Sequence, residues 1–488
     1  MPAEPQLPDR PLVHHTPPQG WMNDPNGLVH HDRQWHLCYQ HQPDALVWGP
    51  MHWGHAVSRD LLTWEHLPVA LEPDEQGAIF SGSAVLDREG RSGYGPEALL
   101  AFFTYHRDGD RGQALAGSVD GGRTWTKHAA NPVLPAPADS TVFRDPRVLR
   151  YRDPSGGAWW VMVVAAGDAV RFHRSDDLLR WTHTGTLGGL TDGGLGTVET
   201  PELVELDVDG GPERAWMLAF GHDTGGPHGG SATRYLVGGF DGACFTPLHG
   251  TDGVRWADQG ADFYAAQSWT DAPEGRCLWI GWLSNWAYAA SVPATSWRGM
   301  MSLPRELRLV RDTTGVPVLA QQPVQELDAA RHRLVELHEP DLEVARAALA
   351  EVAGPCLDVR LEIEVPSEAA GVLDLGVHVP RDAPAASGAG SRVRYEVGSR
   401  QLVVDRSHAG AALPPAAPTV LRSTPLEPGE ELDLRIVADT SSVEVFAARG
   451  TTVLSAQVLP PEATRVRLDQ LPAGARILHL DIGEIVVR

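Results

Sequence analysis

A short pattern recurs about every sixty residues through the first three hundred residues: a serine, an acidic turn and then an aromatic residue. The copies are SRDLLTWEH from Ser58, SVDGGRTWTKH from Ser118, SDDLLRWTHTG from Ser175 and the looser GFDGACFTPL from Gly239. Each copy has the composition of a hairpin turn that leads into a strand. Two such hairpins could coincide by chance, but four copies spaced 60, 57 and 64 residues apart favour a repeated structural unit.

The repeat predicts the fold of the first part of the chain. Short apolar runs separated by Gly, Pro, Asp and Asn indicate strands, and stretches with helical periodicity are few. A period near sixty in an all-β chain is typical of a β-propeller with four-stranded blades, and about 300 residues accommodate five of them. We therefore expect an all-β fold in which residues 1–320 form a five-bladed β-propeller.

The composition and periodicity of the sequence change after the repeat ends. Residues 321–353 contain helix-compatible stretches and are predicted to be a linker with helical character. Alternating strands return afterwards, for example in CLDVRLEIEV, RYEVGSRQLVVD and ELDLRIVADTSSVEVFA. Several short strands separated by turn signals predict a β-sandwich over residues 354–488.

Composition excludes several classes of function. A formal net charge of -23 over 488 residues argues against nucleic acid or an anionic membrane as a partner. The four cysteines lack CxxC spacing, and the nine histidines between residues 14 and 66 fit no paired-ligand pattern. We expect no cofactor and no metal site, and a monomer or homodimer. The amino terminus lacks a signal-like segment, which predicts a cytoplasmic location, or secretion if a signal has been trimmed.

Four acidic residues and one serine share the period of the hairpins but precede them by about half a blade. Asp24 lies in WMNDPNG, Ser81 in FSGSAV, Asp145 in FRDPRV, Glu199 in TVETPELVEL and Asp262 in ADFYAAQSW, at spacings of 57, 64, 54 and 63 residues. Equivalent positions in successive blades predict that these residues meet on the innermost strands, at one mouth of the central channel. Turn residues surround the first acid, so we expect Asn23–Gly27 to form a tight turn that aims Asp24.

Converging carboxylates are what glycoside hydrolysis requires. One ionised acid supports an oxocarbenium-like centre, while a second acid with a raised pKa protonates the leaving oxygen. Taken singly, an Asp-Pro acid is often a turn former, and Glu199 could be an exposed strand residue. Shared periodicity favours a functional role for Asp24, Asp145 and Glu199, whereas Asp262, in the weakest motif, is interpreted as structural.

The same motifs resemble glycoside hydrolase family 32, which comprises invertases, exo-inulinases and levanases. WMNDPNG, WGHAVSRDL, IFSGSAV, FRDPRV, ETPEL, DFYAAQSW and SNWAYAASVPATSWRGMMSLPREL follow the family's order and spacing, and VDRS and SSVEVF extend the likeness into the sandwich. The resemblance implies that Asp24 is the nucleophile of a retaining mechanism, Glu199 the general acid/base and Asp145 the transition-state stabiliser. It also implies that the fructose pocket is shaped by Asn23, Gln40, Trp48, Phe80, Ser81, Arg144 and Trp297.

Two departures from the family pattern stand out. The family usually has Cys after the acid/base, where this chain has Thr200. The sandwich motif lacks its usual Arg, with Thr440 in its place, so one salt bridge there is expected to be missing. Hydrogen bonds from Asn23 and nearby amides are expected to keep the pKa of Asp24 low, and burial or a neighbouring carboxylate to raise that of Glu199.

The expected function is release of terminal β-D-fructofuranosyl units from sucrose, fructo-oligosaccharides, inulin or levan, through a covalent fructosyl-enzyme. A transfructosylase that passes the fructosyl group to a sugar is an open alternative, because a sugar hydroxyl can replace water as acceptor. More distant alternatives are an inverting arabinan or xylan hydrolase on the same propeller, and a catalytically inactive fructan-binding protein. Intact Asp24, Asp145 and Glu199 argue against the last.

Overall fold

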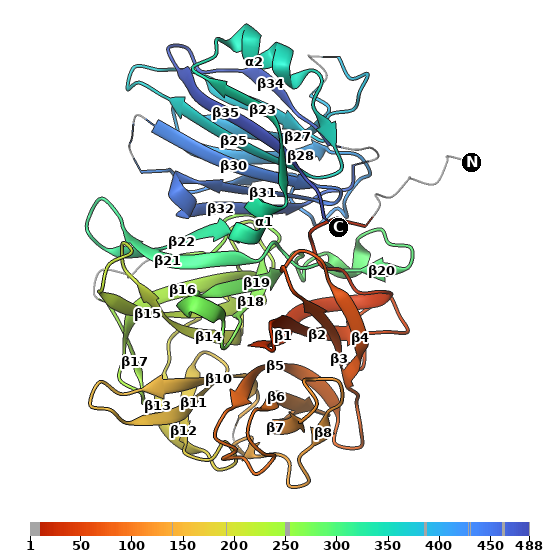
Figure 1. The fold of residues 1–488 in the computed structure, drawn as a ribbon, viewed down its shortest axis with the longest axis vertical. Coiled ribbons are helices and arrows are strands. Elements are labelled where there is room, and N and C mark those ends of the chain that lie inside the picture. The colour runs from red at the N-terminus through yellow and green to blue at the C-terminus, as the bar shows by residue number, and fades with distance from the viewer. Residues whose placement is uncertain are drawn as a thin grey trace.

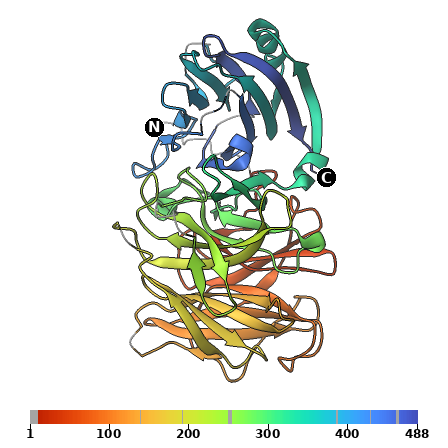
Figure 2. The ribbon, with the colours of Figure 1, turned by 90° about the vertical axis from the view of Figure 1, so that its left-hand side faces the viewer.

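The protein consists of two all-β parts, shown in Figure 1 for the computed structural model. The structure describes residues 10–138, 140–191, 193–248, 254–384, 388–427, 429, 431–460 and 464–487. Strands of the first part run from red to green in Figure 1 and those of the second from teal to blue, and the two parts lie at opposite ends of the long axis in Figures 1 and 2. None of the described helices is long and apolar enough to cross a membrane.

The first part contains five sheets, each with four antiparallel strands arranged in chain order. The first sheet consists of β1 (Gly20–His31), β2 (Gln34–Gln42), β3 (His52–Ser58) and β4 (Glu65–Leu71). The second consists of β5 (Ala78–Asp87), β6 (Ala98–His106), β7 (Asp110–Ser118), β8 (Thr126–Lys127) and β9 (Leu134–Pro135). The third consists of β10 (Arg144–Arg152), β11 (Ala158–Ala165), β12 (Val170–Ser175) and β13 (Thr182–Leu187). The fourth consists of β14 (Val198–Asp207), β15 (Arg214–His222), β16 (Ala232–Phe240) and β17 (Phe245–Pro247). The fifth consists of β18 (Tyr264–Ser268), β19 (Leu278–Trp282), β21 (Arg305–Arg311) and β22 (Pro317–Pro323).

The five sheets close into a ring through their first strands. Strand β1 packs against β5, β5 against β10, β10 against β14, β14 against β18, and β18 against β1. Strand β20 (Trp297–Arg298), from a loop of the fifth sheet, also pairs in parallel with β1 and ties the last blade to the first. The predicted five-bladed β-propeller is therefore confirmed, with the first strand of each blade innermost.

The repeated serine pattern forms the turn between the third and fourth strands of a blade. Ser58, Ser118 and Ser175 end β3, β7 and β12, and each hydroxyl oxygen accepts a hydrogen bond from a backbone N–H three or four residues later. The acidic residue two positions after each serine also accepts backbone N–H groups of its own turn. The turn thus satisfies its own backbone donors, which explains why the pattern repeats with the blades.

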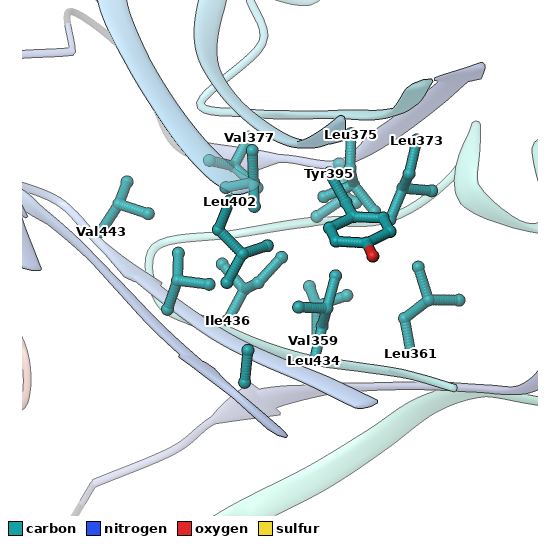
Figure 3. Packing of buried hydrophobic residues seen from close by; sticks show 14 of the residues in the cluster. Val359, Leu361, Leu373, Leu375, Val377, Tyr395, Leu402, Leu434, Ile436 and Val443 are labelled. Atoms are coloured by element: carbon teal, nitrogen blue, oxygen red, sulfur yellow. The ribbon is translucent and has the colours of Figure 1, made fainter. Parts of the chain in front are cut away.

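The second part is a sandwich of two packed sheets. One sheet has the order β23 (Arg331–His338), β35 (Arg476–Ile485), β25 (Leu357–Glu364), β30 (Glu431–Asp439), β31 (Ser442–Ala447) and β32 (Thr452–Gln457). The other has the order β29 (Val420–Arg422), β28 (Gln401–His408), β27 (Gly390–Glu396), β26 (Val372–Val377) and β34 (Arg467–Gln470). Strands β24 (Ala353–Gly354) and β33 (Thr464–Arg465) form a separate pair. Figure 3 shows the core between the sheets, where Val359, Leu361 and Ile436 face Leu375, Tyr395 and Leu402.

The segment predicted to be a linker is partly a strand of the sandwich. The propeller ends with β22 at Pro323, and the helices α1 (Gln325–Ala329) and α2 (Leu342–Leu349) account for the helical character. Between them β23 pairs with β35, because Val335 and Leu337 supply apolar side chains that pack against the sandwich core. The linker interpretation of residues 321–353 was therefore too broad. The short 3-10 turns of the described chain are η1 (Pro273–Gly275), η2 (Ala289–Ser291) and η4 (Ala448–Gly450).

A buried ion pair joins the two parts. Arg406, in the VDRS motif of the sandwich, lies 2.6 Å from Asp262 of the propeller, and both side chains are fully buried. The hydroxyl of Tyr288 and the backbone N–H of Gln457 donate to the same Asp262 carboxylate. The structural interpretation of Asp262 therefore agrees with its position, since the residue holds the interface and does not line the candidate site.

A second buried network joins the amino-terminal segment, the propeller and the sandwich. Glu444, in the SSVEVF motif, pairs with Arg305 at 2.6 Å and with His14 at 2.9 Å. His14 also lies 2.8 Å from Asp439. The backbone N–H of Thr440, which stands where the family has Arg, donates to that Asp439 carboxylate. In this chain the partners of Asp439 therefore include His14.

The charge of His14 predicts a pH-dependent stability. Burial alone lowers the pKa of His14, but hydrogen bonds to Asp439 and Glu444 overcome this and raise it to about 9. Because this exceeds the ordinary value of 6.5, His14 stabilises the fold fully below about pH 6.5, and the contribution disappears as pH rises through about 9. Urea unfolding midpoints should fall over this window in the wild type and much less in His14→Gln. The exposed His332→Gln serves as control, and equal slopes for the wild type and His14→Gln would contradict the assignment.

Candidate active site

A β-bulge interrupts the innermost strand of every blade at the same place. The pairing register shifts between Met22 and Pro25 on β1, and the other shifts are as follows: Ile79 to Gly82 on β5, Arg144 to Arg147 on β10, Glu199 to Glu202 on β14, and Tyr264 to Gln267 on β18. Bulges bend a strand and redirect its side chains, and they are enriched near active sites. Asp145, Thr200 and Ala265 have φ angles of 61°, 45° and 54°, which are strained for non-glycine residues. The shared period of the acids is thus the period of these bulges.

The stretch predicted to be a tight turn around Asp24 is instead part of strand β1. Residues 20–31 form one strand with two register shifts, so the turn prediction was wrong. Asn26 performs the turn-like role inside the strand, since its side-chain amide donates to the backbone oxygens of Asp24 and Pro25. Gly27 has φ 57°, and a Cβ there would lie 2.8 Å from the ring of Trp53, which explains the glycine.

The bulges surround a cavity of about 570 Å³ at one mouth of the propeller channel. All three candidate catalytic acids line it, together with six of the seven candidate substrate-binding residues. Its described lining consists of Asn23, Asp24, Gln40, Trp48, Phe80, Ser81, Arg144, Asp145, Glu199, Asp223, Thr224, Gly230, Trp286 and Ala287.

Trp297 is the candidate that the structure places elsewhere. It lies in β20, pairs with Gly20 of β1, stacks under the guanidinium of Arg10 and lines a separate small hollow beside Arg298. Trp286 of the same sequence motif lines the cavity instead. Of the two tryptophans in this motif, the structure therefore brings Trp286 to the cavity, whereas Trp297 lies outside its described lining.

Asp24 is buried and held by two side-chain donors. The amide of Asn23 donates to its Oδ1 at 2.9 Å, and the hydroxyl of Ser81 donates to its Oδ2 at 2.7 Å. Asn23 is in turn fixed by the indole N–H of Trp21 at 2.8 Å. Burial raises the pKa of Asp24 above its ordinary value, and these hydrogen bonds only partly counter it. The expectation of a low pKa was thus wrong in direction, because desolvation outweighs the donors.

Glu199 occupies a different environment across the cavity. Burial raises its pKa to about 7, and the charges of Asp24 and Asp223 act in the same direction, whereas Arg144 and Tyr264 lower it. The Tyr264 hydroxyl donates to Oε2 at 2.5 Å, and Nη1 of Arg144 lies 3.4 Å from Oε1. The Glu199 side chain keeps 19% of its surface exposed, so a bound molecule can reach it. The expected direction of its pKa shift agrees with this environment.

Asp145 lies beside Glu199 and is bound through the backbone. The N–H of Thr200 donates to its Oδ2 at 2.8 Å, and the Thr104 hydroxyl accepts from the N–H of Asp145 at 3.0 Å. Burial and the charge of Glu199 raise the pKa of Asp145 well above its ordinary value. The Thr200 hydroxyl is buried and has no hydrogen-bond partner among the described residues. The residue that replaces the family Cys thus contacts Asp145 through its backbone.

Arg144 and the aromatic residues shape the side of the cavity. Arg144 is anchored by Asp110 at 3.0 Å and lies over the ring of Phe80. Phe80 also contacts the half-exposed Trp48 edge to face. Gln40 donates to the Asn26 side chain at 2.8 Å and to the Ile79 backbone oxygen at 3.0 Å, so it links β1 to β5 within the cavity lining.

Sequence reasoning missed Asp223, Thr224 and Trp286. Asp223 and Thr224 directly follow β15, and Trp286 follows β19, so none of them shares the position of the periodic acids on the first strands. Oδ1 of Asp223 is buried and has no hydrogen-bond partner among the described residues. Asp223 and Thr224 lie in the loop sequence His222–Gly225, which has no distinctive catalytic pattern, so only the fold brings these side chains to the cavity.

Below the cavity the channel is filled by buried polar side chains. Arg147 pairs with Glu202 at 2.7 Å and donates to the Ser268 hydroxyl at 2.8 Å. The opposite mouth forms a separate cavity of about 500 Å³, and the two share no described lining residue. The site is therefore a blind pocket closed at the bottom.

Similarity to known proteins extends over both parts of the chain. The model of the Glycosyl hydrolases family 32 N-terminal domain matches residues 14–323, and that of the family 32 C terminal matches residues 326–478. A levanase of Bacillus subtilis (strain 168) is 42% identical over 97% of this chain and 70% of its own length. An extracellular exo-inulinase of Aspergillus awamori is 33% identical over 98% of this chain and 95% of its own. A crystal structure of exo-inulinase from Aspergillus awamori matches with a TM-score of 0.85 over 98% of both chains, at 31% identity.

Two acids in contrasting environments at one cavity are what hydrolysis of a glycosidic bond needs. With these matches, the protein is a glycoside hydrolase. The chain belongs to glycosyl hydrolases family 32, and its two parts correspond to the N-terminal and C-terminal domains of that family.

Proposed function

We propose that the protein releases terminal β-D-fructofuranosyl units from fructans, fructo-oligosaccharides and sucrose with retention of configuration. The observation that carries the proposal is the pairing of Asp24 and Glu199 across one blind pocket. Asp24 is fixed by two donors, and the pKa of Glu199 is about 7. In such a pair, Asp24 acts as the nucleophile and Glu199 acts as the general acid.

In the first step the Asp24 carboxylate attacks the anomeric carbon of the terminal fructosyl unit. Glu199 donates its proton to the glycosidic oxygen, and the bond between that oxygen and the anomeric carbon breaks. In the second step ionised Glu199 takes a proton from water, whose oxygen displaces Asp24 from the anomeric carbon. Asp145 accepts hydrogen bonds from fructose hydroxyls and stabilises positive charge at the sugar ring in both steps.

The shape of the pocket supports attack at chain ends. Because Arg147, Glu202 and Ser268 fill the channel below it, a polymer cannot pass through the propeller, which favours entry of a chain end into the pocket. The aromatic residues Trp48 and Trp286 lie on its lining, where they can pack against the next sugar. Levanase and exo-inulinase as relatives support β-fructans as the substrate class.

Products from concentrated sucrose, inulin and levan, resolved over time, test this proposal. We expect free fructose as the first product from each polymer, without early accumulation of internal oligosaccharides. Fructosylated sugars in excess of free fructose would favour the transfructosylase alternative. Absence of both products from all three substrates would contradict the proposal.

The environments of Asp24 and Glu199 predict a bell-shaped pH dependence of kcat/KM. Activity should fall above about pH 7, because Glu199 must be protonated to act as an acid. It should fall on the acid side as Asp24 becomes protonated, beginning above the ordinary aspartate range because its pKa is raised.

Tyr264→Phe removes a hydrogen bond that lowers the pKa of Glu199, so the alkaline limb of the pH profile should move up by about one pH unit. Tyr235→Phe, a buried tyrosine outside the cavity lining, should leave the profile unchanged, and an unmoved limb in Tyr264→Phe would contradict the assignment.

A further inference from the structure

Three potential metal ligands lie together on the outer face of the sandwich, away from the catalytic pocket. Glu336 and His338 belong to the edge strand β23, and His479 belongs to the neighbouring strand β35. One ligand atom from each of the three side chains lies within 4.8 Å of the others. We propose that Glu336, His338 and His479 form a binding site for a divalent transition-metal ion such as Zn²⁺.

The strand register brings these side chains to one face. His338 pairs directly with His479, and Glu336 is two positions before His338. Cross-strand partners and alternate residues of a strand point to the same side of a sheet. The intervening Leu337 packs against the sandwich core, so the three ligands point outward. The backbone thus fixes the positions of the three Cβ atoms.

The local hydrogen bonds leave ligand atoms available. Oε2 of Glu336 accepts from Arg333, while its Oε1 lies 3.7 Å from Nε2 of His479 and 3.9 Å from Nε2 of His338. Nε2 of His479 is shielded from solvent and has no hydrogen-bond partner among the described residues. The nearby Asp481 is occupied by Arg331 and Arg333. An unpartnered imidazole nitrogen facing a carboxylate oxygen is suited to share a cation with it.

The donor set selects the kind of metal. Two imidazoles and one carboxylate favour Zn²⁺, Ni²⁺ or Cu²⁺ over Mg²⁺ and Ca²⁺, which prefer oxygen ligands only. Metal–nitrogen bonds of about 2.0–2.1 Å require the stacked rings of His338 and His479 to separate and turn toward a common point. The His338 side chain is 74% exposed, so it has room to rotate while the strands stay in place. Water can complete the coordination.

A bound ion would cross-link the edge of the sheet. Strand β23 has a neighbour on one side only, and it follows α1 directly after the propeller. Its pairing with β35 is interrupted by a register shift between Arg333 and Val335. An ion held by both strands beyond that shift opposes separation of β23 from the sandwich, because a ligand that binds only the folded state stabilises it.

Calorimetric titration of the full chain with ZnCl₂ after chelator treatment tests the site. We expect binding that His338→Ala and His479→Ala each weaken at least tenfold and that Glu336→Gln weakens less, with no binding of Mg²⁺. His332→Ala is the matched control, since it is an exposed histidine on the same strand outside the cluster. Absence of Zn²⁺ binding by the wild type, or equal binding by the variant lacking both histidines, would overturn the proposal.

Hydrogen exchange provides a second readout that distinguishes this site from binding elsewhere, for example at a cysteine. Zn²⁺ should slow exchange of the backbone amides of residues 331–338 in the wild type and in His332→Ala, but not in His479→Ala. Exchange without Zn²⁺ should be the same in all three proteins, which verifies that the variants are folded. Zn²⁺ protection that persists in His479→Ala would contradict the site.

Discussion

Replacing Asp24 with asparagine is expected to lower kcat on sucrose or a fructan by about 10⁴-fold or more, a loss typical of removing a catalytic nucleophile. The amide is nearly isosteric and remains next to Asn23 and Ser81, which hold the carboxylate at present. The change therefore removes the proposed nucleophile with little effect on packing. Initial rates at saturating substrate, with the thermal unfolding midpoint measured in parallel, provide the check.

Two further variants define the specificity of that effect. Asp44→Asn changes an exposed aspartate outside the cavity lining and should leave kcat unchanged. Ser81→Ala removes one donor to Asp24 and should cost about 10- to 100-fold, because hydrogen bonds to charged groups contribute about 1.5–3 kcal/mol. An Asp24→Asn enzyme that keeps more than about a hundredth of the wild-type kcat would be incompatible with a nucleophilic role.

Replacing Arg406 with methionine is expected to destabilise the protein by about 3–5 kcal/mol. The change leaves the Asp262 carboxylate buried without its cation, between the propeller and the sandwich. The hydroxyl of Tyr288 and the N–H of Gln457 remain as donors but carry no charge. Urea unfolding followed by tryptophan fluorescence measures the loss.

An exposed ion pair of similar length serves as the control, because it has the same charges as the Arg406–Asp262 pair but is not buried. Arg422 and Glu396 are 2.7 Å apart, nearly the same distance, but their side chains are 46% and 35% exposed. Arg422→Met should therefore cost less than about 1 kcal/mol. Combining Asp262→Asn with Arg406→Met removes the orphaned charge and should recover much of the lost stability. Equal losses for Arg406→Met and Arg422→Met would show that the buried pair does not hold the interface.

The repeat near sixty residues predicted the propeller because three blades share the same turn interactions and a fourth has a looser copy of the pattern. The Ser58, Ser118 and Ser175 turns satisfy their own backbone, so their signal is local and readable from sequence. The boundary between the two parts of the chain, at residues 321–353, was harder to predict from the sequence. Helix-like composition described α1 and α2 correctly, but the pairing of β23 with β35 depends on residues more than a hundred positions away.

The candidate site was predictable where it followed the blade period. Asp24, Ser81, Asp145 and Glu199 occupy the bulges of successive innermost strands, so their spacing carried the information. The local backbone was not predictable: WMNDPNG has turn composition, yet β-pairing with β2 keeps it in a strand. The tertiary ladder thus overrides the local preference of Asp-Pro-Asn-Gly.

The remaining differences concern features that only the packed structure creates. The pKa of Asp24 depends on desolvation, which spacing does not reveal. Trp286 and Trp297 belong to one sequence motif. The pairing of β20 with β1 holds Trp297 away from the cavity that Trp286 lines. The grouping of Glu336 and His338 with His479 likewise arises from the order of strands in the sandwich sheet.

Mass spectrometry of a trapped intermediate tests the central claim most directly. In Glu199→Gln, an activated donor such as p-nitrophenyl β-D-fructofuranoside needs no acid for the first step, while the missing base slows the second. Proteolysis of the stalled enzyme should yield the peptide that contains Asp24 with one fructosyl unit attached, and the adduct should be absent when Asp24→Asn is added. Nitrophenol release without an adduct on Asp24, or with a fructosyl unit on another residue, would contradict the account.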